Sequence, residues 1–118
     1  DIHWRLGKYL YQKGRKNEAK TNYYKTLAIN PNSYQAHMGL AEIEYKSNNP
    51  IQSISHLQSI LGREPNNFMV HYRLAEVYDA LNKKKESAYH FELAVALQHS
   101  NDSVTSNSRK AEKKVKSE

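Results

Sequence analysis

The sequence contains no cysteine, only four glycines and three prolines, and no long apolar run. Without cysteine, disulfides, thiol catalysis and thiolate metal sites are excluded, although this absence does not identify the compartment. The longest apolar run, residues 93–97, is far shorter than the ~20 residues of a membrane span. No basic start followed by an apolar segment indicates a signal peptide. We therefore expect a soluble protein, away from membranes, and favour the cytoplasm.

The sequence also lacks the patterns that carry catalysis. Its few glycines form no phosphate-binding loop, and no nucleophile stands in a recognisable motif with a base. The acidic residues fall mostly on expected helix faces, where they are usually solvated. We therefore predict that this segment is not an enzyme and has no cofactor and no small-molecule substrate.

Positive charge is abundant but uneven. The net charge is +6, and residues 1–33 hold seven lysines and arginines against two acidic residues. Residues 102–118 hold five against three, while the residues between them are close to neutral. An excess of this kind attracts anionic partners over long range. Nucleic-acid binding through residues 1–33 and the tail therefore stays open as an alternative.

A repeat dominates the 118 residues, a length that suits one small domain. The chain begins at Asp1 rather than methionine, so we expect a processed product or a piece of a longer protein. Shifting the sequence by 34 residues aligns identical residues, namely His3/His37/His71, Leu6/Leu40/Leu74, Tyr11/Tyr45, Leu27/Leu61 and Pro31/Pro65. A period in this range indicates stacked supersecondary units. The predicted units are residues 1–33 (unit one), 34–67 (unit two) and 68–101 (unit three).

Apolar spacing predicts two helices in each unit. Val70, Leu74 and Val77 follow the spacing of one helical face. In unit one, Ile2, Leu6, Tyr9 and Leu10 follow the same pattern. We expect these faces to form the core. The predicted helices span residues 2–13, 17–29, 34–47, 50–61, 68–81 and 84–98.

Turn residues agree with these boundaries. Gly14, Asn48 and Asn82 occupy the same corner of successive units, and glycine and asparagine are the residues that tolerate a left-handed backbone. Asn49 is expected to cap the next helix, with Gln52 completing a capping box.

The repeat resembles the tetratricopeptide repeat, whose pattern is W-x2-L-G-x2-Y, then A-x3-F, then P. Unit one supplies Leu6-Gly7, Ala19-x3-Tyr23 and Pro31. Histidines replace the first tryptophan of the pattern, and Glu44 stands where an aromatic residue is usual. The resemblance implies an all-α fold, a right-handed superhelical stack (α-solenoid) of three antiparallel helix-turn-helix repeats over residues 1–101. Residues 102–118 would be a polar basic tail, disordered or weakly helical.

In the tetratricopeptide family the first helix of every unit lines a concave groove. The resemblance therefore implies a protein-binding scaffold or adaptor that holds a peptide or helix of a partner protein. We expect the large rings facing this groove to be anchors, because exposed aromatic side chains usually mark contact surfaces. The predicted groove residues are Trp4, Arg5, Lys8, Tyr11, Met38, Glu42, Tyr45, Met69, Tyr72, Arg73 and Glu76.

One subtype of the family grips the acidic tails of chaperones with a carboxylate clamp of lysine, asparagine and arginine residues. At the clamp positions this sequence has Trp4, Lys8, Gly39, Met69 and Arg73, of which only Arg73 matches. We therefore expect no clamp of that kind. A structural segment of a longer array, or a homo-oligomer formed through the ends of the repeats, stays open as an alternative to groove binding.

The six histidines suggest a metal site, but their spacing argues against one. Equivalent positions on neighbouring helices are separated by ~8–10 Å. Two imidazoles on one zinc must bring their nitrogens to about 3 Å, because each bond is only ~2.0–2.1 Å long. We therefore predict no metal site.

Overall fold

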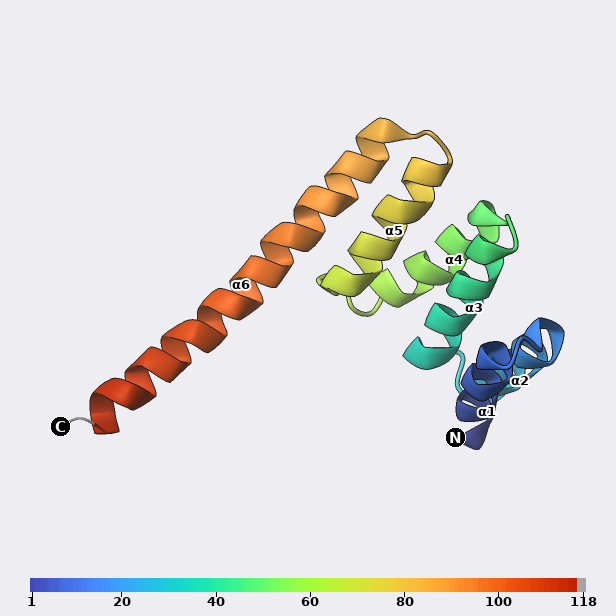
Figure 1. The fold of residues 1–118 in the computed structure, drawn as a ribbon, viewed down its shortest axis with the longest axis horizontal. Coiled ribbons are helices and arrows are strands. Elements are labelled where there is room, and N and C mark those ends of the chain that lie inside the picture. Colours follow the sequence, from blue (N-terminus) through green and yellow to red (C-terminus); the bar gives the residue numbers. More distant parts are fainter. Residues whose placement is uncertain (117–118) are drawn as a thin grey trace.

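Six helices follow one another without strands in the residues that the computed structural model describes, which are 1–116 for the backbone and 1–101 for the side chains. They are α1 (Ile2–Gln12), α2 (Lys16–Ile29), α3 (Tyr34–Lys46), α4 (Pro50–Leu61), α5 (Phe68–Ala80) and α6 (Lys84–Lys116). The all-α repeat solenoid predicted from the sequence is confirmed. In Figure 1 the α1–α2 hairpin lies at one end of the array and α5 and α6 at the other. No helix within the described part is long and apolar enough to cross a membrane.

The first five helices begin and end within one residue of their predicted bounds, but α6 does not. It continues past the predicted end at residue 98 to Lys116, because no proline or glycine interrupts the sequence after unit three. The predictions for the side chains of the basic tail fall on residues 102–118, which lie outside the described side chains.

The corner of each hairpin has the predicted left-handed backbone. The φ angles are 80° at Gly14, 64° at Asn48 and 59° at Asn82. A residue with a β-carbon other than asparagine or aspartate rarely adopts this conformation. The 34-residue period thus repeats a backbone conformation as well as a side-chain pattern.

The start of α4 corrects the predicted capping box. Asn49 precedes the helix, but its side chain caps no backbone N–H. Its amide donates instead to Glu44 Oε2 at 2.9 Å, and Lys20 Nζ lies 2.7 Å from Glu44 Oε1. The side chain of Glu44 is only 5% exposed, so both of its oxygens need partners. The carboxylate in place of the usual aromatic residue therefore joins unit one to unit two.

The lysine determines the charge state of this carboxylate. The hydrogen bond from Lys20 lowers the pKa of Glu44 and outweighs burial, which acts in the opposite direction. The same hydrogen bond raises the pKa of Lys20. Both groups are therefore charged at neutral pH, and the contact between the units is an ion pair.

The core consists of two clusters, and each bridges two units. The first joins α1, α2 and α3, and the second joins α3, α4 and α5. Their buried members are Leu10, Ala19, Tyr23, Ala36, Leu40 and Ile43 in the first cluster, and Ala41, Leu57, Ile60, Val70, Leu74 and Val77 in the second. Neighbouring units thus stabilise one another across each boundary, as in other repeat arrays.

Unit one departs from the predicted core. Ile2, Leu6 and Tyr9 lie on the predicted apolar face of α1, yet all three are exposed, and only Leu10 of this face is buried. The equivalent faces of α3 and α5 are buried because the second helix of the preceding unit packs on them. Among the described residues, no helix occupies that place beside α1.

Candidate functional site

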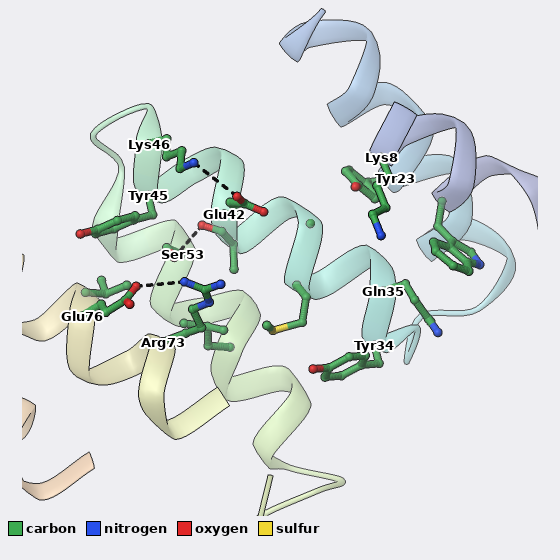
Figure 2. A pocket seen from close by; sticks show the side chains of 16 residues that line it. Lys8, Tyr23, Tyr34, Gln35, Glu42, Tyr45, Lys46, Ser53, Arg73 and Glu76 are labelled. Carbon is green, nitrogen blue, oxygen red and sulfur yellow. Dashed lines mark hydrogen bonds and ion pairs between the residues drawn. The ribbon is translucent and has the colours of Figure 1, made fainter. Parts of the chain in front are cut away.

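A cavity of about 510 Å³ lies along the first helices of all three units. Trp4 and Lys8 reach it from α1, the side chains of α3 form its middle, and Arg73 and Glu76 reach it from α5. Figure 2 shows Lys8 and Tyr23 on one side of this space and Arg73 and Glu76 on the other. The groove is therefore a composite of three units.

Most of the predicted groove residues line this cavity. They are Trp4, Lys8, Met38, Glu42, Tyr45, Arg73 and Glu76. The first five of them come from α1 and α3, on either side of the boundary between units one and two. The structure thus brings side chains far apart in the sequence to one surface.

Four predicted groove residues lie outside the cavity: Arg5, Tyr11, Met69 and Tyr72. Arg5 lies over the ring of Trp4, with its guanidinium carbon 5.4 Å from the ring centroid. Tyr11 packs against the first core cluster. Tyr72 contacts Phe91 of α6, with ring centroids 5.7 Å apart. For these residues a role in binding stays a prediction.

The predicted anchors that line the cavity are more buried than the sequence indicates. Trp4 is partly buried against the first core cluster, and Met38 and Tyr45 are partly buried against the second. The apolar spacing that predicts the core includes none of the three. They therefore contribute to folding as well as to the surface, and each substitution there needs a stability control.

The floor of the cavity includes side chains that the sequence did not indicate, among them Tyr23 of α2 and Leu57 of α4. Tyr23 reaches the cavity because Gly39 has no side chain, and a β-carbon at Gly39 would overlap the Tyr23 ring. Leu57 occupies the equivalent position one unit later. The glycine at position 39 was the available signal, because a glycine inside a helix often marks a close approach.

The charges around the cavity are mostly paired. Glu42 Oε1 lies 3.4 Å from Lys46 Nζ, and Glu76 Oε2 lies 3.2 Å from Arg73 Nη1. Both pairs are drawn as dashed lines in Figure 2. Lys8 forms no ion pair within residues 1–101. The ammonium of Lys8 is therefore the cation in this cavity whose charge no neighbour neutralises.

Comparison with known families identifies the architecture. Residues 1–33 match the tetratricopeptide repeat family. This segment is a tetratricopeptide repeat. Units two and three repeat unit one at a spacing of 34 residues, and all three form the same helical hairpin. The search of curated proteins finds no match to the chain.

Tetratricopeptide repeats act in general as protein–protein interaction scaffolds. The two helices of a hairpin approach each other closely at the small residues of the repeat pattern. Ser53 donates to the carbonyl of Ala41 at 2.8 Å, and Ser87 donates to the carbonyl of Ala75 at 2.9 Å. A larger side chain at these serines would separate the two helices of the hairpin.

Two histidine pairs lie inside the hairpins of units two and three, away from the cavity. His37 Nδ1 lies 3.1 Å from His56 Nδ1, and His71 Nδ1 lies 3.0 Å from His90 Nδ1. A comparison of histidines at equivalent positions of neighbouring units does not reveal these pairs, because both partners lie within one unit. Both pairs span 19 residues, and this spacing was the available signal. No group of three or more metal-ligating side chains forms among the described residues.

Backbone carbonyls fix the protons of the pairs. The Nε2–H of His37 donates to the carbonyl of Pro31 at 2.8 Å, and that of His71 donates to the carbonyl of Pro65 at 2.8 Å. In their neutral form, His37 and His71 therefore carry no proton on Nδ1. This nitrogen accepts a hydrogen bond from the Nδ1–H of His56 or His90. A pair with both rings charged would place two protons between the same nitrogens. Each pair therefore holds at most one positive charge.

We expect the stability of the chain to fall between pH 7.5 and pH 5. Burial lowers the pKa of His56 and His90, and the paired His37 and His71 lower it further. The unfolded chain, with histidine pKa values near ~6.5, then binds more protons than the folded chain. This part of the stability is complete above the unfolded pKa and is lost as the pH falls through the folded values. Urea unfolding at both pH values measures the difference.

The control for this prediction is the double variant His56→Gln/His90→Gln, whose amides can still donate to the partner rings. Its stability should change much less over this range, in which few carboxylates titrate. An equal loss in the variant and in the parent protein would contradict a role of the pairs.

Proposed function

We propose that the chain is a noncatalytic binding module that holds a peptide or short helix of a partner protein in the cavity between its three units. The observation that supports this proposal is the cavity itself, because it is continuous across the first helices of all units. A space of about 510 Å³ accommodates a few side chains of a ligand rather than a whole domain. The partner therefore inserts a short segment.

Aromatic side chains would supply most of the affinity. Trp4, Tyr34 and Tyr45 line the cavity and are partly buried, so they are already held in place by their neighbours. Rings of this kind lose little conformational entropy on binding and dominate the energy of many interfaces.

Charge would set the orientation of the ligand. The two ion pairs of the cavity can exchange partners with a bound segment, whereas Lys8 is available to an acidic residue without breaking an existing pair. We therefore expect the bound segment to combine an apolar residue with an acidic one. Exposed charges act mainly on the association rate and are screened within ~8–10 Å at physiological salt.

The experiment starts with peptides selected from a random displayed library against the whole chain. Replacing Trp4 by alanine should weaken their binding by ~2 kcal/mol or more, about thirtyfold. Lys8→Ala should slow association at low salt and lose its effect at high salt. Fluorescence anisotropy and stopped-flow titration measure both effects, and circular dichroism checks the fold.

The matched control is Tyr24→Ala, which removes an exposed ring of α2 that does not line the cavity. It should leave the affinity unchanged. Failure to select any peptide would contradict the proposal, and so would peptides that bind the Trp4 variant normally but are lost in His56→Ala or His90→Ala. Binding of an oligonucleotide that weakens steeply with salt would support the nucleic-acid alternative instead.

A further inference from the structure

The hairpins of units two and three hold the same arrangement of facing imidazoles. The Nδ1 atoms of His37 and His56 are 3.1 Å apart, and the ring centroids are 5.3 Å apart. For His71 and His90 the two distances are 3.0 and 5.2 Å. These centroid distances are nearly the largest that rings with such close nitrogens can have. The rings of each pair therefore meet head-on, and the lone-pair direction of each Nδ1 points at the other nitrogen.

One ring of each pair is oriented in the way that a metal ligand needs. His37 donates its Nε2–H to the carbonyl of Pro31, which leaves the lone pair on Nδ1. His71 donates in the same way to the carbonyl of Pro65. A histidine that binds a metal through one nitrogen usually donates its other N–H to a carbonyl or a carboxylate, which fixes the tautomer and the orientation of the ring.

The second ring of each pair is able to adapt. Within the described residues, Nε2 of His56 and of His90 has no hydrogen-bond partner, and neither atom is buried. The proton on Nδ1 of these rings can therefore move to Nε2 through solvent, which leaves both facing nitrogens with a lone pair. A metal on the line between two nitrogens needs them about 4 Å apart, because bonds from imidazole to a metal are ~2.0 Å long. The half-buried rings of His56 and His90 have to move outward by only about 1 Å to reach this distance.

We propose that each histidine pair binds one monovalent copper ion, Cu⁺, with the two Nδ1 atoms as linear ligands. Imidazole is a good ligand for copper, and Cu⁺ is stable with two ligands in line, whereas structural Zn²⁺ is almost always bound by four. No group of three metal-ligating side chains includes either pair in the part of the chain with described side chains. The distance that argues against a metal between units does not apply here, because both ligands lie within one hairpin.

Unit one provides the internal comparison. Asn22 stands 19 residues after His3, where units two and three have their second histidine. The amide of Asn22 donates to the carbonyl of Glu18 at 2.9 Å, and Nδ1 of His3 is buried without a partner. Because only one imidazole is present, we expect no copper site in this hairpin. None of the four paired histidines lines the cavity, so the proposal is independent of ligand binding there.

Silver ion, Ag⁺, is the first probe, because it has the charge and the linear coordination of Cu⁺ and needs no reductant. Added to the whole chain labelled with nitrogen-15, it should change the Nδ1 chemical shifts of the four paired histidines. The shifts of His3 and His99 should stay almost unchanged. Equal changes at His3 and at the paired histidines would overturn the proposal.

Calorimetric titration of variants with Ag⁺, and with Cu⁺ kept reduced under nitrogen, counts the sites. His56→Gln and His90→Gln should each bind one ion fewer than the parent chain, and the double variant should bind two fewer. His3→Gln is the matched control and should bind as many ions as the parent chain. Ions on the thioethers of Met38 and Met69 do not affect these differences, because both residues are present in every variant.

The glutamine amides can still donate to the partner rings, so the variants should keep the fold, which circular dichroism checks. Zn²⁺ should bind far more weakly than Cu⁺, because the pair supplies only two ligands. An unchanged number of bound ions in the double variant would overturn the proposal. Binding of Zn²⁺ to the parent chain as tight as that of Cu⁺ would also overturn it, because that result requires further ligands at the pairs.

Discussion

Replacing Leu40 by alanine is expected to lower the free energy of unfolding by ~2–5 kcal/mol. The side chain is fully buried between unit one and unit two, so the change leaves a cavity at a boundary on which both units depend. Leu74→Ala should have a similar effect at the next boundary, because Leu74 is 1% exposed. Urea unfolding followed by circular dichroism measures both losses.

Leu6→Ala is the matched control, since Leu6 has the same residue type and the same position in unit one. It is 44% exposed and should cost less than ~1 kcal/mol under conditions in which the chain is a monomer. Equal losses at Leu6 and Leu40 would mean that α1 is covered in solution. Losses below roughly 0.5 kcal/mol at both Leu40 and Leu74 would contradict the assignment of the core.

Replacing Gly39 by alanine is expected to destabilise the chain by ~1–3 kcal/mol or more. In an open helix the same change would stabilise by up to ~1 kcal/mol, because alanine is the better helix former. Here the new β-carbon would overlap the ring of Tyr23, which is only 5% exposed and has little room to move. The sign of the effect therefore reports whether the two units are in contact at this point.

A second substitution tests the cause. Tyr23→Leu removes the ring, and leucine is the residue that occupies the equivalent position at Leu57. Gly39→Ala should therefore cost much less in the Tyr23→Leu background than in the parent chain, a coupling that a double-mutant cycle measures. Gly62→Ala, at a helix end with an ordinary φ of −59°, is the control and should be close to neutral. Additive effects of the two substitutions would contradict the contact.

The helices and their corners could be predicted because they depend on local information. Gly14 and Asn48 mark a backbone conformation that few other residues adopt, and the apolar spacing of Val70 and Leu74 identifies a helical face. Whether such a face is buried depends on what lies beside it. Leu6 has the same pattern as Leu74 and is nevertheless exposed, because no helix covers α1.

The residues that line the cavity likewise depend on contacts between units, which the pattern of one unit does not contain. Met38 and Tyr72 share one position of the repeat, yet only Met38 lines the cavity. Residues of α5 line the cavity beside Met38, whereas no described helix follows the third hairpin beside Tyr72. Asn49 was predicted as a cap from its place before Pro50, but the buried carboxylate of Glu44 takes its amide instead. Contacts between units decide these outcomes, and a pattern within one unit does not contain them.

The most direct test of binding in the cavity is a map of backbone amide shifts when a selected peptide is added to the labelled chain. If the cavity is the binding site, the largest shifts should fall on Lys8, Gln35, Gly39, Glu42 and Arg73, which line it from all three units. Residues of the second helices whose side chains face outward, such as Tyr24 and Ile51, should show almost no change in amide shift. Large shifts confined to α2 and α4, with the amides along the cavity unchanged, would contradict binding in the groove.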